Sequence, residues 1–268
     1  MEPAAAIDAI VRELRSEPSI RALFLGGSYG AGLEDAYSDI DFVMVASDGP
    51  SDDVAALWKK AVSRTGKIVL WWDRQVRPSL VNAITRDWLR TDVVILKPDQ
   101  MAGHAKDSLK VLFDHDGIFA TLPESLPPTG PDPKRARYQF EEFIRILGLL
   151  PLALGREEYL NGVLGVFLLR NLLVDLMIGE TGAPHRGGIL HLNRLITGEQ
   201  KQVLISLPLP APERQALIDA HLLYAEAYLP RARRLARLWG EEWPAEFEAA
   251  TWERLAATLA IRPPGSAD

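Results

Sequence analysis

The first half of the chain alternates short apolar runs with polar segments. Six runs have the length and composition of β-strands, and they cover residues 21–25, 40–46, 67–72, 80–85, 91–96 and 111–113. Residues 51–64 place apolar side chains at helical spacing behind a candidate N-cap, Ser51 or Asp52. Residues 7–14 have the same spacing, which predicts an amphipathic helix and not a signal peptide. The pattern predicts a mixed sheet with flanking helices.

The second half of the chain has helical periodicity. Predicted helices cover residues 134–147, 157–178, 185–196, 212–239 and 244–259. Residues 122–133, which precede them, are rich in proline and read as a linker. We therefore expect an α+β domain with a mixed sheet over residues 1–130, followed by an all-α helical bundle over residues 131–268.

One predicted helix is as apolar as a membrane span. Residues 159–178 have about the length that crosses a bilayer. Asn161, Arg170, Asn171 and Asp175 lie within this stretch, and their burial in lipid would be costly. The composition thus favours a helix inside a bundle and no membrane partner.

Composition and charge narrow the classes of function. The 268 residues contain no cysteine, which excludes disulfides, thiolate metal sites and cysteine nucleophiles and fits a cytoplasmic protein. The net charge of −6 does not favour a nucleic-acid partner. One basic run, Arg231, Arg233, Arg234 and Arg237, reads as a solvated helix face. An acidic protein suits a cationic small substrate.

The chemistry is concentrated between the first two strands. The first strand runs into Gly27 and Ser28, and the second begins at Asp39, with Asp41 two residues later. Side chains two apart on a strand share a face about 7 Å apart, while Ile40, Phe42 and Met44 face a core. Two such carboxylates can hold Mg²⁺ together with nucleotide phosphates. The glycines let backbone approach a ligand, and Ser28 adds a hydroxyl donor.

This segment resembles the signature of the DNA-polymerase-β-like nucleotidyltransferase superfamily: glycine and serine, about ten residues, then two aspartates separated by one residue. The layout is most similar to the aminoglycoside and lincosamide nucleotidyltransferases, in which a catalytic domain precedes a helical domain that helps to bind the drug. Residues 111–118 also resemble the strand and turn that close their catalytic domain. The resemblance implies Mg²⁺ in one or two copies, ATP as donor, and transfer of AMP to a hydroxyl with release of pyrophosphate.

The resemblance also implies a third carboxylate on a neighbouring strand. Asp92 has the required place, just inside the run 91–96, and would serve as metal ligand, as general base for the acceptor hydroxyl, or as both. Asp73, at the end of the preceding strand, is the competing residue. Asp114 and Asp116 are expected to shape the turn at Gly117.

The helical half supplies weaker candidates. A carboxylate wall for the amines of an acceptor is a hypothesis for Glu141, Glu142, Glu158 and Asp175. The alternative is that these carboxylates are solvated on helix faces and complement the helix dipole. Asp175, however, needs a partner in so apolar a helix, and Arg170 is near it but not at ideal spacing. By resemblance, Arg186, and with it Lys201, would contact the nucleotide phosphates.

The leading interpretation is an adenylyltransferase that acts on an aminoglycoside-like antibiotic. Three alternatives stay open: a lincosamide acceptor, a protein or RNA acceptor, and a catalytically silent nucleotide-binding relative. The sequence identifies neither the acceptor hydroxyl nor the oligomeric state.

Overall fold

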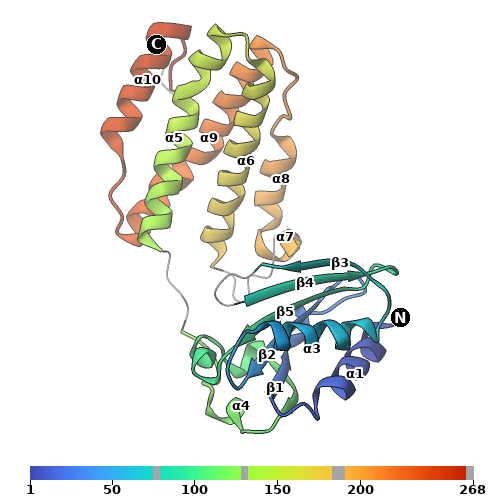
Figure 1. Ribbon diagram of the computed structural model, residues 1–268. Coiled ribbons are helices and arrows are strands. Elements are labelled where there is room, and N and C mark those ends of the chain that lie inside the picture. Colours follow the sequence, from blue (N-terminus) through green and yellow to red (C-terminus); the bar gives the residue numbers. More distant parts are fainter. Residues whose placement is uncertain (75–78, 128–131, 183–190, 264–268) are drawn as a thin grey trace. The chain divides into compact units, whose positions relative to one another are not determined.

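A computed structural model describes residues 1–74, 79–127, 132–182 and 191–263. Contacts divide the chain into two compact units, Met1–Pro128 and Thr129–Asp268, and Figure 1 shows a sheet with helices in the first and a bundle of helices in the second. The predicted fold class, a mixed-sheet domain followed by a helical region, is confirmed.

The first unit is built on a six-stranded sheet with the strand order β3-β4-β5-β2-β1-β6. The strands are β1 (Ile20–Leu25), β2 (Ile40–Ala46), β3 (Ile68–Asp73), β4 (Ser79–Thr85), β5 (Arg90–Leu96) and β6 (Lys110–Asp114). Central strands β2 and β5 run parallel, and every other neighbouring pair is antiparallel. All six predicted strands are present within one or two residues of their predicted ends.

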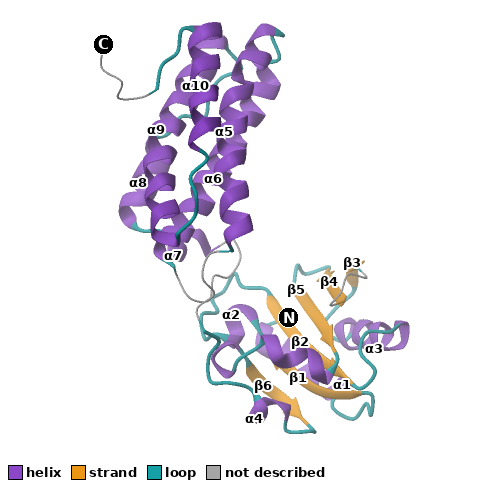
Figure 2. Ribbon diagram, turned by 90° about the vertical axis from the view of Figure 1, so that its left-hand side faces the viewer, coloured by secondary structure: helices purple, strands orange, loops and turns teal. Residues whose placement is uncertain are grey.

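Two helices cover one face of this sheet. They are α1 (Pro3–Leu14) and α3 (Asp52–Ser63), and both are seen in Figure 2. The Ser51 side chain caps α3 by accepting from the backbone N–H of Val54. The buried ring of Trp58 on α3 lies edge-on to Phe42 of β2, with 5.0 Å between ring centroids. The larger core of the unit therefore lies between the sheet and these helices.

The opposite face is covered over part of its area. Short 3₁₀ turns η1 (Pro98–Gly103) and η2 (Lys106–Ser108) and the one-turn helix α4 (Ile118–Thr121) close a smaller apolar cluster. This cluster takes Phe24 from β1 and Val43 and Val45 from β2. Because β2 has buried side chains on both faces after Asp41, its run of apolar residues shows no alternation.

The second unit contains α5 (Pro133–Gly155), α6 (Tyr159–Thr181), α7 (Leu192–Leu195), α8 (Gly198–Ser206), α9 (Arg214–Trp239) and α10 (Ala245–Leu259). The prediction ended α5 near residue 147, but the helix continues through Pro151 because Leu150 and Leu154 keep a buried face at helical spacing. Helix α8 had no counterpart among the predicted helices, although Thr197 and Gln200 form its capping box. The predicted helix over residues 185–196 lies partly outside the described residues.

Helix α6 supplies much of the bundle core. Within the described part of the chain it is the one helix long and apolar enough to cross a membrane, by length and composition alone. Leu169, Leu173 and Met177 are nevertheless buried against the other helices of the unit. Asp175, the carboxylate that the sequence leaves in need of a partner, accepts from Gln139 Nε2 at 3.3 Å and lies 3.5 Å from Arg135, both on α5. Arg170 donates instead to the Tyr224 hydroxyl.

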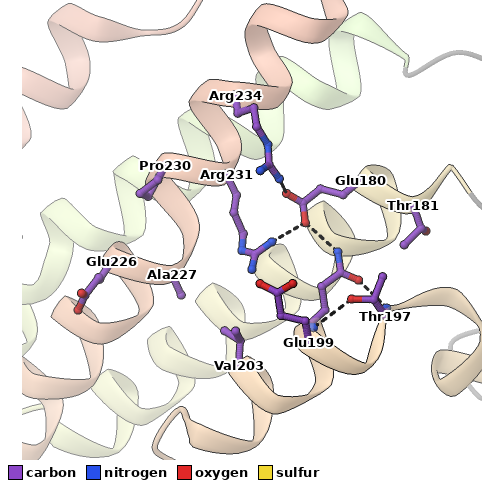
Figure 3. A pocket seen from close by; sticks show the side chains of 11 residues that line it. Glu180, Thr181, Thr197, Glu199, Val203, Glu226, Ala227, Pro230, Arg231 and Arg234 are labelled. Carbon is purple, nitrogen blue, oxygen red and sulfur yellow. Dashed lines mark hydrogen bonds and ion pairs between the residues drawn. The ribbon is translucent and has the colours of Figure 1, made fainter.

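The basic run of α9 is only in part the solvated face that the sequence predicted: Arg234 and Arg237 are exposed, whereas Arg231 and Arg233 are partly buried. Arg231 and Arg234 both bind Glu180 of α6, as Figure 3 shows. Glu180 also accepts from Gln200 Nε2 at 2.8 Å. Arg233 pairs with Glu248 of α10. The Glu180 and Glu248 side chains are 7% and 8% exposed, so these arginines neutralise two buried carboxylates and join α9 to α6 and to α10.

Glu180→Gln is expected to lower the free energy of unfolding of the helical unit by about 1–3 kcal/mol, because Arg231 loses its charged partner in a largely buried site. Glu180, Arg231 and Glu226 line one pocket of the helical unit. Glu226→Gln is the matched control, since Glu226 is exposed there. Urea unfolding followed by far-ultraviolet circular dichroism measures both. Equal effects of the two substitutions would show that the Glu180 cluster contributes little to stability.

Candidate active site

The site begins where β1 ends. After Leu25 the chain passes through Gly26 into the one-turn helix α2 (Gly27–Gly30). The backbone N–H of Gly26 donates to the Asp41 carbonyl at 2.9 Å, which ties this turn to β2. Gly27 has a φ of +52°, and a Cβ atom on it would lie 1.9 Å from Oδ2 of Asp41. The glycine is therefore required because the Asp41 carboxylate occupies the space of its missing side chain.

Ser28 brings an unusual hydroxyl to this turn. Its Oγ atom is buried and has no hydrogen-bond partner among the described residues. A buried hydroxyl without a partner is costly, and a ligand atom that accepts from it would remove that cost. Its position beside Gly27 and Asp41 makes it a donor for a ligand atom in the site.

Three carboxylates gather on this face of the sheet. Asp41 of β2 and Asp92 of β5 are direct neighbours in the parallel register, so their side chains lie on the same face. Asp39 precedes β2 and lies two residues before Asp41. Its negative charge raises the pKa of both other carboxyls, in line with its position on the same face. The structure thus brings together Gly27, Ser28, Asp39, Asp41 and Asp92.

The electrostatics of the cluster fit a site for a cation. Burial, followed by the charges of Asp39 and Asp92, raises the pKa of Asp41 to about 6. Burial also raises the pKa of Asp92, against a hydrogen bond from Asn82 and the positive charges of Arg90 and Arg74. Like charges held this close without neutralisation destabilise the ligand-free fold, so a bound cation would be favoured.

The donor set matches magnesium shared with a substrate. Among the described residues, no three acidic or histidine side chains lie close enough together to hold a metal ion by themselves, so a metal here would need ligand atoms from a substrate. Mg²⁺ prefers oxygen ligands and is usually held by one or two carboxylates, with phosphate oxygens and water completing its coordination. Asp39, Asp41 and Asp92 fit this open kind of site, together with the Ser28 hydroxyl, which finds no partner within the described ranges.

Asp41→Asn is expected to stabilise the ligand-free protein at pH 7 by on the order of 1–2 kcal/mol, allowing for partial solvent screening. Because the pKa of Asp41 is raised on folding, its ionisation lowers stability as the pH rises from about 4 to about 6. The difference in melting temperature between variant and unmutated protein should therefore shrink by about half at pH 5. Differential scanning calorimetry without Mg²⁺ measures it, and a pH-independent difference would contradict the prediction.

Three neighbours of the carboxylates were not predicted from the sequence. Arg90 Nη1 lies 3.7 Å from Asp39, and its Nη2 donates to the Tyr37 carbonyl at 2.7 Å. Asn82 of β4 stands opposite Asp92 and donates a hydrogen bond to its carboxylate. Arg74 Nε donates in turn to Asn82 Oδ1 at 2.9 Å. Strand alternation could have suggested Asn82 only if the order of the strands had been known.

The competing residue Asp73 faces away from the cluster. It stands opposite Val81 of β4, which is buried on the face covered by α1 and α3. Directly opposed residues share a face, so the register separates Asp73 from Asp92.

Asp114 accepts from the Phe119 N–H at 2.8 Å and Asp116 pairs with Arg21, in line with their predicted role at the turn.

The candidates in the second unit are mostly engaged with their own helices. Glu141 pairs with Arg137 at 2.7 Å, and Glu142 with Arg145 at 2.6 Å. Together with the contacts of Asp175, these pairs do not form the free carboxylate wall that the sequence suggested. Glu158 is exposed at the start of α6, Lys201 is half-buried on α8, and Arg186 lies outside the described residues.

A comparison with protein families points to the same chemistry. Residues 7–89 match the family model of the nucleotidyltransferase domain, a stretch that includes Gly27, Ser28, Asp39 and Asp41. The fold is similar to an aminoglycoside 6-adenyltransferase from Bacillus subtilis (13% identity, 95% of this chain and 98% of that chain, TM-score 0.43). It is also similar to a nucleotidyltransferase-like protein from Exiguobacterium sibiricum 255-15 (14% identity, 96% and 88%, TM-score 0.34).

Neither of these structural likenesses is close enough to assign a substrate, and no curated protein matches the chain. One conclusion follows from the matched stretch, from the pairing of β2 with β5 and from the turn at Gly27 and Ser28. The N-terminal unit is a nucleotidyltransferase domain of the DNA-polymerase-β-like superfamily.

Proposed function

We propose that the protein is an adenylyltransferase that moves AMP from ATP to a hydroxyl of a small acceptor and releases pyrophosphate, in a magnesium-dependent reaction. The observation that carries this proposal is the register of β2 and β5, which sets Asp41 beside Asp92 and close to the glycine turn. In the family, this chemistry mostly uses a nucleoside triphosphate with Mg²⁺.

The residues divide into two roles. Asp39 and Asp41, with Asp92, would hold the metal, which when bound neutralises charge on the triphosphate. Ser28 Oγ, which is buried and has no partner in the described part of the chain, would donate to a phosphate oxygen. Arg186 and Lys201 remain proposed phosphate contacts.

The reaction needs a proton acceptor for the attacking hydroxyl. Asp92 is suited to this task, because its raised pKa improves it as a base while the hydrogen bond from Asn82 fixes its carboxylate. As the acceptor oxygen bonds to the α-phosphorus, the bond from that phosphorus to the bridging oxygen breaks. Pyrophosphate leaves, and the hydroxyl proton passes to Asp92.

An aminoglycoside-like antibiotic is the first acceptor to test, given the net charge of −6. The arginine partners of Glu141, Glu142 and Asp175 weaken the case for a polycation, so lincosamides belong in the same panel. A protein or RNA acceptor has no observation in its favour.

Pyrophosphate release tests the proposal. The protein is incubated with ATP and Mg²⁺ and a panel of hydroxyl-bearing acceptors, with EDTA as the control and the other nucleoside triphosphates for comparison. Acceptor-dependent, EDTA-sensitive release is expected. Thermal stabilisation by ATP and Mg²⁺ without release for any acceptor would favour a catalytically silent nucleotide-binding protein instead.

A further inference from the structure

The row of side chains that holds the carboxylates continues across the sheet. Asp92 of β5 stands opposite Asn82 of β4, and Asn82 stands opposite Trp72 of β3. Directly opposed residues share a face, so Trp72, Asn82, Asp92 and Asp41 form one line. With strands about 4.8 Å apart, Trp72 lies roughly 10 Å from Asp92, a distance that a single sugar or aromatic ring can bridge.

Trp72 is an accessible aromatic surface at the end of this row. It retains 53% of its surface accessible, whereas Trp71, its neighbour on the opposite face, packs against the helix-covered core. The turns that cover this face of the sheet contact β1, β2 and β5, while Leu70, Leu80 and Ile84 on β3 and β4 are only partly buried. Among the described residues of the first unit, the outer part of the face is therefore an open shelf that leads to Asp92.

Arg74 fixes both the polar and the aromatic part of the shelf. Its guanidinium lies over the Trp72 ring, 5.6 Å from the centroid, and its Nε donates to Asn82. Because Asn82 Oδ1 accepts from Arg74, the amide N–H₂ of Asn82 is left to donate to Asp92. Arg74 thereby holds Asn82 in one orientation and places a positive charge beside the aromatic ring.

The chemistry of this shelf identifies a class of acceptor. A half-exposed indole favours the apolar face of a sugar or an aromatic ring. The Arg74 guanidinium disfavours a ligand with several positive charges at this place. We propose that the acceptor is an alcohol of low positive charge whose sugar or aromatic ring stacks on Trp72 while its hydroxyl reaches Asp92. This inference rests on the proposed transfer reaction and narrows its substrate.

Two matched pairs of variants test the proposal in the full-length protein. Trp72→Leu removes the ring, and Trp88→Leu removes an exposed tryptophan in the turn between β4 and β5. Arg74→Gln removes one positive charge from the shelf. Arg86→Gln removes one positive charge from the turn between β4 and β5 and is its control. Trp72→Leu should raise the KM for a neutral ring-bearing alcohol about two- to ten-fold with little change in kcat or in the KM for ATP. Trp88→Leu should change none of these constants.

Arg74→Gln should raise kcat/KM for polycationic aminoglycosides relative to neutral glycosides, whereas Arg86→Gln should not change that ratio. The proposal is overturned if the unmutated protein uses polycations with a higher kcat/KM than neutral glycosides, or if Trp72→Leu behaves like Trp88→Leu.

Binding is followed separately from turnover. The indole N–H resonance of Trp72, assigned by its loss in Trp72→Phe, should shift when aryl glycosides are added at millimolar concentrations. No shift with any member of the panel overturns the stacking proposal, even where pyrophosphate is released. A shift without pyrophosphate release supports ring binding at Trp72 and counts against the transfer reaction.

Discussion

Replacing Asp39 and Asp41 together with asparagine is expected to lower the rate of pyrophosphate release by about 10³-fold or more. Asparagine keeps the size of each side chain and removes the charges that would hold Mg²⁺ against the triphosphate. A loss of several kcal/mol in transition-state stabilisation corresponds to this factor. The fold should survive, because the carboxylates repel one another in the ligand-free protein and their charges are not needed for packing.

The chain offers a matched control with the same spacing. Asp114 and Asp116 also stand two residues apart at the end of a strand of this sheet, but they serve the turn at Gly117. Asp114→Asn with Asp116→Asn should leave the KM for ATP and the dependence on Mg²⁺ unchanged. If the Asp39 and Asp41 variant retains magnesium-dependent activity comparable to this control, the proposed metal site is wrong.

Gly27→Ala is expected to lower activity by about 10²-fold, because the methyl group and the Asp41 carboxylate cannot occupy the same space. The new Cβ would lie 1.9 Å from Oδ2 of Asp41, so either the turn or the carboxylate must move. Displacement of a reacting group by about 1 Å is enough for an effect of this size. Steady-state pyrophosphate release at saturating ATP measures it.

Gly32→Ala separates the contact from the backbone strain. Gly32 has a φ of +66°, close to the +52° of Gly27, but a Cβ on it would meet nothing within 4 Å. Both substitutions should cost about 1 kcal/mol of stability through the left-handed backbone, and only Gly27→Ala should also affect catalysis. Equal losses of activity in the two variants would mean that strain in the turn, and not the contact with Asp41, limits the reaction.

The sequence predicted what depends on local pattern. The apolar runs located all six strands, and the candidate cap at Ser51 or Asp52 located the start of α3, where the structure has Ser51 as the cap. The spacing of Ser28 from Asp39 located the site turn. Asp92 was proposed from resemblance, and the register that sets it beside Asp41 depends on a parallel pairing between strands that are not consecutive in the chain. Asn82 and Arg74 were missed for the same reason, because their place beside Asp92 follows from the strand order.

The helical half was harder to interpret because its polar contacts join distant segments. Arg231 and Arg234 read as a solvated face, since their partner Glu180 lies more than 50 residues earlier in the chain. Asp175 is held by residues of α5, which no spacing within α6 could suggest. The arginines of α9 stabilise the bundle because their partners Glu180 and Glu248 are buried, and the density of arginines in the sequence does not reveal this.

The contact between Gly27 and Asp41 also constrains how this protein can evolve. As long as the carboxylate is present, every side chain larger than hydrogen at position 27 meets it, and the left-handed backbone at this position favours glycine independently. A descendant that lost Asp41 would keep only the backbone constraint, which asparagine or aspartate can also satisfy. A residue other than glycine at position 27 would therefore mark, among homologues, a lineage that no longer carries the carboxylate.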